Sequence, residues 1–464
     1  MTQILIPSSL IGLTPLVQQY LLLAQEQGFN IDNIELGVSS TLYFQLVQHQ
    51  QSTTLSTDLI PKVSDDLTSS FVIYYHSKLA VAECINHPIE SIFISIDDPV
   101  LIDDKAVLNQ MDIWRCPIRN EVRAISIKEG LADNFVPKVH FSWVVALLAL
   151  DFPIEDCLIL SRAMCNRKIN VSRETFGDDA IFFEPNQWAY EFAQFPVPVI
   201  EDSRLGNEVS WLSRDKLSRF PAIPKKSLGL YPVVDRTDRL EQIISLGITT
   251  IQLRIKNPNQ PDLEQEIIKS IELGHRYNVK IFINDYWQLA IKHGAYGVHL
   301  GQEDIHAANL IDINKAGLRL GLSTHSYYEL LRVAPLYPSY IAIGHVFPTN
   351  TKQLVSKPQG LVRLALYQKL INSIIQPRSP DEPGSDHGID YPIPTVAIGG
   401  INQSNADQVW QCGVSSLAVI GAITSALCLE TTIRFFSDLM QDKYPQAIKG
   451  RAVTPNDLRK TYDQ

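Results

Sequence analysis

Cysteines, long apolar runs and surplus positive charge are all scarce in this sequence of 464 residues. No two cysteines are spaced as CxxC, so the sequence indicates neither a zinc knuckle nor a disulfide framework. The longest fully apolar stretch, Trp143 to Leu150, is far shorter than the ~18 residues that cross a bilayer. We therefore predict no membrane partner. Because no basic segment opens the chain, we expect a cytoplasmic protein. We expect its six cysteines to be reduced core thiols: Cys84, Cys116, Cys157, Cys165, Cys412 and Cys428.

Acidic residues outnumber basic ones, fifty to forty, which gives a net charge of -10. Such a chain offers no general field for a polyanion, so we expect no nucleic-acid partner. The hydrophobic fraction of 45% and charged fraction of 19% are typical of a packed protein and exclude disorder and coiled coil. Any site for a phosphorylated ligand must be local, built from a few cations, backbone N–H groups or a metal.

The length predicts two large domains. Two prolines and a basic pair in SRFPAIPKKS, residues 218–227, are typical of a linker. We therefore predict one domain over 1–217, a second over 228–445 and a tail over 446–464. The sequence leaves open whether the chain forms a homo-oligomer.

Eight short runs rich in β-branched residues follow the linker, with helix-like segments between them. Buried runs that alternate with helices predict a parallel sheet, and eight units over roughly 210 residues predict a closed (β/α)8 TIM barrel. An open doubly wound α/β sheet is the structural alternative. The runs are GLYPVV, ITTIQLRI, VKIFIN, YGVHLG, LRLGLST, YIAIGHVF, TVAIGG and SLAVIGAI.

The polar residues of the second half favour the barrel, because nearly all follow the C-terminal ends of these runs. A closed barrel gathers such ends around one mouth, where barrel enzymes have their active sites. The first half is predicted as a separate mixed α/β domain. Its strand-like runs lie at 69–77, 91–98 and 122–130, and two helices between 138 and 164 are joined at Asp151–Pro153.

Gln252, Arg254 and Lys256 alternate along the second run, which predicts that all three side chains face the barrel interior. Solvated charge is the alternative for any single cation. Arg254 can fork onto phosphate oxygens and Lys256 can add a point charge, while Gln252 can bind a polar ring edge.

Two carboxylates, Asp285 and Asp304, follow neighbouring runs and could together hold Mg²⁺, which takes one or two carboxylates plus substrate phosphates. Each could instead cap a helix. His299 is as compatible with a hydrogen-bonded core histidine as with a catalytic base.

Later loops offer groups that suit an anion. Thr349, Thr351 and Lys352 follow the sixth run, where a simple turn is the alternative. The pair Gly399 and Gly400 follows the seventh run, and Gly421 lies in the eighth. Barrels frequently form phosphate sites there from backbone N–H groups.

Taken together, GLYPVVD, TTIQLRIK, FINDYWQLAIKHGAYGVHLGQED, GLSTH, YIAIGHVFPTNTK and VAIGGI closely resemble the thiamine phosphate synthase family, from about Gly229 to Ala426. The resemblance implies a transferase that joins 4-amino-2-methyl-5-(diphosphomethyl)pyrimidine to a thiazole phosphate, releases pyrophosphate and requires Mg²⁺. It implies catalytic cations at Arg254, Lys256 and Lys352 and magnesium ligands at Asp285 and Asp304.

The resemblance also assigns the two substrates to residues. The thiazole phosphate is assigned to residues in or directly after the last three runs: Thr349, Asn350, Thr351, Gly400, Ile420 and Gly421. At one of these positions the chain departs from the family, because Gly421 replaces the usual serine and so removes a hydroxyl. The pyrimidine diphosphate falls to Gln252, Leu253, Arg254, Ile255, Lys256, Asn284, Ser323 and Lys352. A thiazole tautomerase-like barrel and a catalytically dead barrel that serves as a binding or regulatory subunit are the alternatives.

The helix pair at 138–164 distantly resembles the final helices of a ribokinase-like hydroxymethylpyrimidine phosphate kinase. Such kinases have a glycine-rich anion hole and a Cys or Asp base before that helix, where this chain has Lys138, His140 and Trp143. Without glycines the backbone cannot approach a phosphate, and Trp143 cannot take a proton. We therefore predict a degenerate domain with a structural, oligomerising or ligand-sensing role, and an unrelated fold is the alternative.

Overall fold

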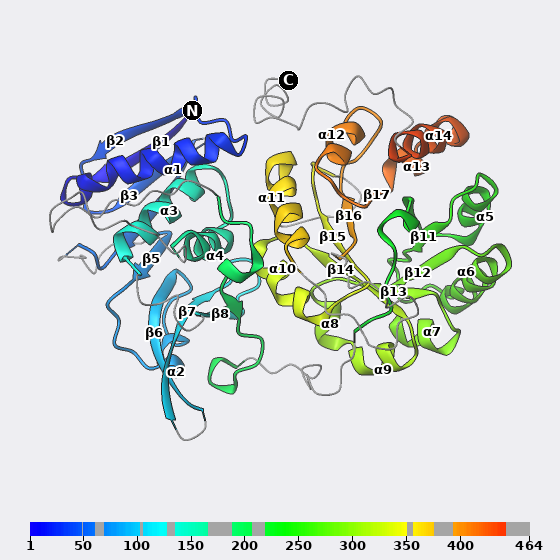
Figure 1. Cartoon of the computed structure of the whole chain (residues 1–464), viewed down its shortest axis with the longest axis horizontal. Coiled ribbons are helices and arrows are strands. Elements are labelled where there is room, and N and C mark those ends of the chain that lie inside the picture. The colour runs from blue at the N-terminus through cyan, green and yellow to red at the C-terminus, as the bar shows by residue number, and fades with distance from the viewer. Residues whose placement is uncertain are drawn as a thin grey trace, which may run out of the picture. The chain divides into compact units, whose positions relative to one another are not determined.

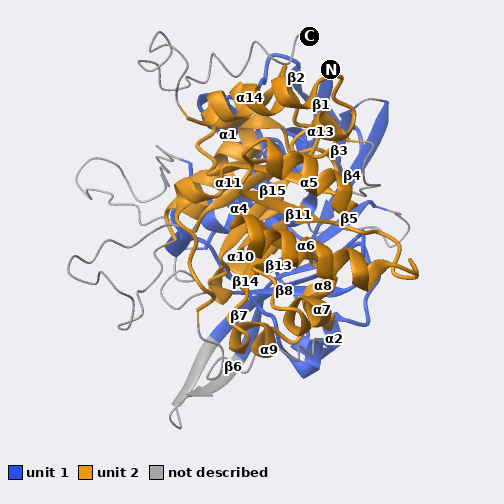
Figure 2. Cartoon of the chain, turned by 90° about the vertical axis from the view of Figure 1, so that its right-hand side faces the viewer, with its two compact units in different colours: residues 1–208, 455–464 blue, residues 209–454 orange. Residues whose placement is uncertain are grey.

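The computed structural model describes residues 1–48, 50–60, 69–102, 105–127, 135–165, 188–206, 219–349, 356–374 and 393–441. These residues form two compact units, within Met1–Glu208 and within Val209–Thr454 (Figure 2). The expected domain limits remain predictions, and the expected tail at 446–464 lies outside the described residues.

Unit 2 contains the predicted closed barrel of parallel strands. Each strand pairs with the next along the chain, and the last pairs with the first, so the open-sheet alternative is wrong. All eight strands are almost wholly buried because side chains fill one face and helices cover the other. They are β10 Leu230–Val234, β11 Thr250–Leu253, β12 Lys280–Asn284, β13 Gly297–Leu300, β14 Arg319–Thr324, β15 Tyr340–Gly344, β16 Thr395–Ile398 and β17 Ser416–Val419.

Helices lie outside the strands and connect them (Figure 1). The longer ones bury an apolar stripe against the barrel, as Leu240 and Ile243 do in α5. The helices are α5 Thr237–Ser245, α6 Leu263–Tyr277, α7 Trp287–Lys292, α8 Asp304–Ala307, α9 Leu310–Lys315, α10 Tyr327–Val333, α11 Gly360–Asn372, α12 Ala406–Gln411, α13 Gly421–Thr424 and α14 Leu429–Met440, with the 3-10 turn η6 Ala334–Leu336.

The amino end of the barrel is filled by aromatic rings and by the chain that leads into it. Tyr231 and Tyr340 share a hydrogen bond of 2.8 Å between their hydroxyl oxygens, and Ile223 packs in the same cluster. The carbonyl of Pro221 accepts a hydrogen bond from the Ser339 hydroxyl at 2.7 Å. The segment predicted as a linker is thus packed, from residue 219 on, beneath the barrel, where it includes the 3-10 turn η5 Lys225–Ser227.

Unit 1 is a separate domain built on a mixed sheet of nine strands in the order β2-β1-β3-β4-β5-β6-β7-β8-β9. The three predicted strand runs are confirmed as β5, β6 and β8. The strands are β1 Thr2–Pro7, β2 Ile34–Ser39, β3 Phe44–Gln48, β4 Gln51–Thr57, β5 Phe71–Tyr74, β6 Ser91–Ile102, β7 Lys105–Arg115, β8 Val122–Ile127 and β9 Val197–Pro198.

Helix α1, Thr14–Glu26, packs on α3, Pro137–Ala149, and the rings of Tyr20 and Trp143 stack with centroids 3.9 Å apart. The predicted helix pair is confirmed, since α4, Ile154–Cys165, follows α3 directly. The remaining short elements of this unit are α2 Val81–Cys84 and the 3-10 turns η1 Ser8–Leu13, η2 Phe192–Gln194 and η3 Ser203–Leu205.

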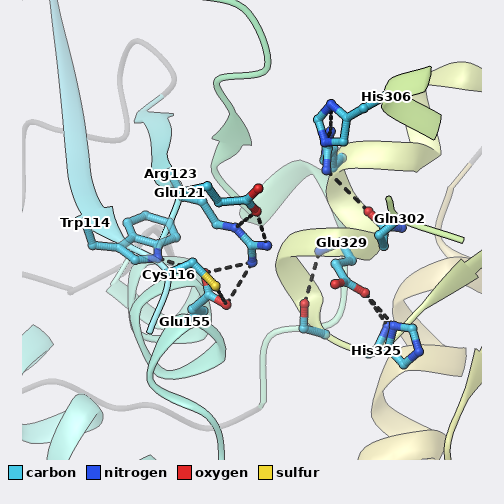
Figure 3. Close-up of polar contacts among 11 residues, drawn as sticks. Trp114, Cys116, Glu121, Arg123, Glu155, Gln302, His306, His325 and Glu329 are labelled. Carbon is cyan, nitrogen blue, oxygen red and sulfur yellow. Dashed lines mark hydrogen bonds and ion pairs between the residues drawn. The ribbon is translucent and has the colours of Figure 1, made fainter. Parts of the chain in front are cut away.

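Helix α4 is joined to the sheet by buried charges. Arg162 donates from Nε to Asp112 of β7 at 2.6 Å, and both side chains are fully buried. Glu155 accepts from the Trp114 indole at 2.9 Å and from Arg123 of β8 at 2.8 Å (Figure 3). Removing one partner would leave a buried charge unpaired, so these pairs fix how α4 sits on the sheet.

Among the described residues, no helix is long and apolar enough to cross a membrane. The cysteines are free thiols as predicted, but they are not all in the core, because Cys428 is exposed.

Candidate active site

A cavity of about 140 Å³ opens at the carboxyl end of the barrel. Every barrel strand, or the residues directly after it, contributes to the lining. The polar lining residues are Gln252, Arg254, Asn284, Asp285, His299, Asp304, Ser323, Thr324, His325, His345 and Thr349, together with Gly301, Gly344 and Gly399.

The end of β11 supplies two of the three polar side chains expected there. Gln252 is buried and Arg254 half-buried, and both line the cavity. Lys256 is exposed and is not among the lining residues, because β11 ends at Leu253 and the strand alternation stops there. Leu253 and Ile255 are buried, so only their backbone groups could meet a ligand.

Two amides meet on the floor of the cavity. The Gln252 side chain donates from Nε2 to Asn284 Oδ1 at 2.8 Å, which fixes both side chains and leaves the Asn284 amide nitrogen as a donor. The Tyr286 hydroxyl donates to the Ile255 carbonyl at 3.0 Å, which ties the segment after β11 to the segment after β12. Burial and the neighbouring Asp285 raise the pKa of Tyr286, so this hydroxyl stays a donor.

Asp285 and Asp304 line the same cavity from neighbouring strands. Asp285 has a left-handed backbone with φ +65°, a strained conformation for a residue other than glycine, and such strain is typical of functional sites. The residue that caps α7 is Tyr286, which makes no side-chain cap. Asp304 begins α8, and its carboxylate accepts from the Gly301 N–H at 3.1 Å. Asp304 therefore combines a local turn contact with a position on the cavity.

This donor set fits magnesium better than zinc. In the part of the chain that the structure describes, no three His, Cys, Asp or Glu side chains are grouped to hold a metal. Zinc needs three or four such protein ligands, whereas Mg²⁺ is commonly held by one or two carboxylates with substrate phosphates and water. Asp285 and Asp304 match the second arrangement.

His299 is a hydrogen-bonded core histidine, one of the two alternatives for it. One ring nitrogen lies 2.7 Å from the Tyr340 hydroxyl and the other lies 2.8 Å from the Ser323 hydroxyl. Both nitrogens are therefore engaged. The contact with His299 holds the Ser323 side chain in place on the cavity wall. The Ser323 carbonyl also accepts a hydrogen bond from the Gln302 side chain at 2.7 Å.

Gly399 and Gly400 allow two loops to approach closely. Both have left-handed backbones, with φ +103° and +67°. A Cβ on Gly399 would lie 2.3 Å from the Cβ of His345, and one on Gly400 would lie 2.7 Å from the Pro348 carbonyl oxygen. Only glycine fits at these positions, and the segment after β15 therefore lies against the end of β16, where the Phe347 N–H donates to the Gly399 carbonyl at 3.1 Å.

Of the remaining predicted site residues, the structure describes some and leaves others out. Ile420 lines the cavity, and Gly421 begins α13. A Cβ added at Gly421 would meet no heavy atom within 4 Å, and the backbone there is not left-handed. A serine would thus fit at 421 without strain. Asn350, Thr351 and Lys352 lie outside the described residues.

Sequence reasoning missed two histidines of the cavity wall, His325 and His345. His345 is buried, and burial, His325 and Arg363 lower its pKa, so it is neutral near pH 7. The ring of His325 is fixed by Glu329. The spacing Ser326-x-x-Glu329 is a capping-box signal that could have located this pair in the sequence.

Comparison with known proteins links the barrel to one family. A family model described as "Thiamine monophosphate synthase" matches residues 230–423. The chain is 52% identical to the thiamine-phosphate synthase of Yersinia pestis (strain Pestoides F) over 207 residues, which are 45% of this chain and 87% of that protein. It is 50% identical to the thiamine-phosphate synthase of Serratia proteamaculans (strain 568) over 212 residues, 46% of this chain and 91% of that protein.

A solved structure titled as a thiamine phosphate pyrophosphorylase from Pyrococcus furiosus is also similar. It shares 27% identity, covers 48% of this chain and 99% of its own, and has a TM-score of 0.39. The matched family range lies wholly within unit 2, and unit 1 remains unassigned.

Proposed function

The chain belongs, through its C-terminal half, to the thiamine-phosphate synthase family, and we propose that the barrel cavity is where its two substrates meet. The substrates are 4-amino-2-methyl-5-(diphosphomethyl)pyrimidine and a thiazole phosphate. The observation that carries this proposal is the convergence of Arg254, Asp285 and Asp304 on one cavity whose floor is the Gln252–Asn284 amide pair.

The pyrimidine diphosphate lies over that floor. The amides of Gln252 and Asn284 bind the polar edge of the ring, and Arg254 forks onto the diphosphate oxygens with Ser323 beside it. Lys352 adds a second cation to the diphosphate, and Lys256 adds a third from the rim. Asp285 and Asp304 hold Mg²⁺, which supplies positive charge to the leaving diphosphate when bound.

The thiazole phosphate lies against the last three strands. Thr349, with Asn350 and Thr351, offers hydroxyl, amide and backbone donors, and the backbone at Gly400, Ile420 and Gly421 completes the phosphate site. Gly421 keeps a backbone donor for this substrate and lacks the hydroxyl that a serine would add.

Catalysis then needs charge neutralisation and alignment. The pyrimidine methylene carbon loses pyrophosphate to leave a stabilised cation, and the thiazole nitrogen forms the new C–N bond. No protein nucleophile is required. Arg254 and the neighbouring cations stabilise the departing charge where it develops. Holding both substrates in contact is worth up to ~7 to 11 kcal/mol in the best intramolecular reactions.

For unit 1 we propose a degenerate domain without kinase activity, with a structural, oligomerising or ligand-sensing role. Helix α3 begins at Pro137, and its N-cap residue, Val136, makes no side-chain cap. His140, Phe141 and Trp143 are buried, so bulky side chains fill the start of the helix. The free thiols suit a reducing compartment, and we propose a cytoplasmic location.

Release of pyrophosphate by the full chain tests the function. A synthase releases pyrophosphate only when both substrates and Mg²⁺ are present. A thiazole tautomerase would change the thiazole phosphate alone without releasing pyrophosphate, and a dead barrel would do neither. Absence of pyrophosphate with both substrates would overturn the proposal.

A further inference from the structure

A histidine and a glutamate form a fixed pair at the cavity wall. Glu329 Oε2 lies 2.8 Å from His325 Nδ1 and accepts the backbone N–H of His325 at 2.8 Å (Figure 3). The Ser326 hydroxyl in turn accepts from the Glu329 N–H at 3.2 Å. One carboxylate oxygen therefore holds both the backbone and the ring of His325.

This pairing determines which ring nitrogen is available. An ionised carboxylate only accepts hydrogen bonds, so Nδ1 of His325 carries a proton and donates it to Glu329. Nε2 is then the nitrogen left for a ligand. His325 lines the cavity, and its side chain keeps 22% of its exposure, whereas that of Glu329 keeps 8%. The carboxylate is thus behind the ring and the ring is at the cavity.

The position of His325 along the chain places it between two groups that already have proposed ligands. Ser323, two residues earlier, lines the cavity where the diphosphate is proposed, and Thr349 lines it after the next strand. His345 lines the same cavity, and His325 is among the groups that lower its pKa. Hydrogen-bond donors therefore gather at this wall, which suits an anion.

We propose that His325 is a further substrate-contacting residue, which donates from Nε2 to a phosphate oxygen, and that Glu329 is the residue that positions it. Between the carboxylate and a phosphate oxygen the imidazole carries a proton on each nitrogen and donates to both. This inference rests on the proposed function. The phosphate belongs either to the pyrimidine diphosphate or to the thiazole phosphate, and binding measurements distinguish them.

Calorimetric titration of each phosphorylated substrate alone into the full chain with Mg²⁺ avoids turnover. His325→Ala should weaken binding of one substrate about tenfold or more and leave the other within about twofold. His325→Gln, which keeps a donor near the place of Nε2, should recover part of the loss. The substrate whose affinity falls identifies the phosphate.

The positioning role of Glu329 is tested by asking whether its effect on binding requires His325. Glu329→Gln keeps an oxygen for the backbone N–H and loses the charge, so it should weaken the same substrate and leave the melting temperature nearly unchanged. In the double variant the two effects should not add, because both act through one ring nitrogen. Additive losses, or a loss shared equally by both substrates, would show a structural role and refute the assignment.

The chain provides a matched control on the outside of the barrel. His293 Nε2 lies 2.8 Å from Glu264 Oε1, its side chain keeps 20% of its exposure, and it does not line the cavity. His293→Ala should bind both substrates like the unaltered chain. If the unaltered chain binds neither substrate, the proposed function itself fails. If it binds both and folded His325→Ala does too, only the role of His325 is overturned.

Discussion

Replacing Gly400 by alanine should impair use of the thiazole phosphate specifically. The backbone of Gly400 has φ +67°, and an added Cβ would lie 2.7 Å from both the Phe347 Cβ and the Pro348 carbonyl oxygen. A carbonyl oxygen is part of the backbone and cannot rotate away. The loop that carries Thr349 must therefore move, and the proposed phosphate contacts move with it.

Two separate costs follow from this geometry. The left-handed conformation costs an alanine about 1 to 2 kcal/mol, which lowers the stability of the folded barrel. Losing one charge-assisted hydrogen bond to the phosphate costs about 1.5 to 3 kcal/mol, which corresponds to a rise in KM of roughly ten- to a hundredfold. KM for the pyrimidine diphosphate should change little.

Gly317→Ala separates these two costs. Gly317 has φ +70°, nearly the same as Gly400, but an added Cβ there meets no atom within 4 Å. Both variants should lose stability in thermal melts, Gly400→Ala the more because its Cβ also meets the Pro348 carbonyl oxygen, and only Gly400→Ala should show the higher KM in a steady-state pyrophosphate assay. A folded Gly400→Ala enzyme with unchanged KM for thiazole phosphate would refute the close-approach argument.

The other predictions concern charge, pH and domain limits. Arg254→Ala removes the cavity arginine and should lower kcat/KM tenfold or more, so a variant with unaltered steady-state kinetics would remove Arg254 from the diphosphate site. Burial and Arg162 lower the pKa of His140 well below its usual 6.5, so the unfolded state binds more protons below about pH 6.5. Stability should therefore fall from pH 7 to 5, and chemical denaturation should show a smaller fall for His140→Asn. A fragment that begins at Arg219 keeps the packed segment beneath the barrel and should make thiamine phosphate. A folded but inactive fragment would show that unit 1 completes the site. The full chain should not phosphorylate the pyrimidine with ATP.

The barrel could be predicted from sequence because its signals are local. Each strand is buried on both faces and is therefore a continuous apolar run, as TVAIGG shows. Closure places the polar residues after these runs around one mouth, so Gln252, Asn284 and Asp285 could be grouped before their contacts were known.

The features of the site that sequence reasoning misplaced or missed depend on where strands end and on long-range contacts. Strand alternation predicted that the Lys256 side chain faces the interior, but the chain leaves β11 after Leu253. The left-handed backbone of Asp285 and the contact of the Gly400 loop with Pro348 likewise depend on neighbouring strands.

Less of unit 1 than of the barrel could be predicted from the sequence, because more of its structure depends on long-range contacts. The apolar runs of β5, β6 and β8 and the helix pair were visible, but the sheet order depends on pairing between distant segments, as when β1 pairs with both β2 and β3. Buried charges such as Arg162 and Asp112 could not be recognised as partners from a separation of 50 residues in sequence.

The most direct test of the central claim is the rate of thiamine phosphate synthesis by the full chain with Mg²⁺ and then with excess EDTA. If Asp285 and Asp304 hold the magnesium that neutralises the leaving diphosphate, synthesis should stop in EDTA and return when Mg²⁺ is restored, with one pyrophosphate released per thiamine phosphate. Synthesis at the full rate in EDTA would contradict the account.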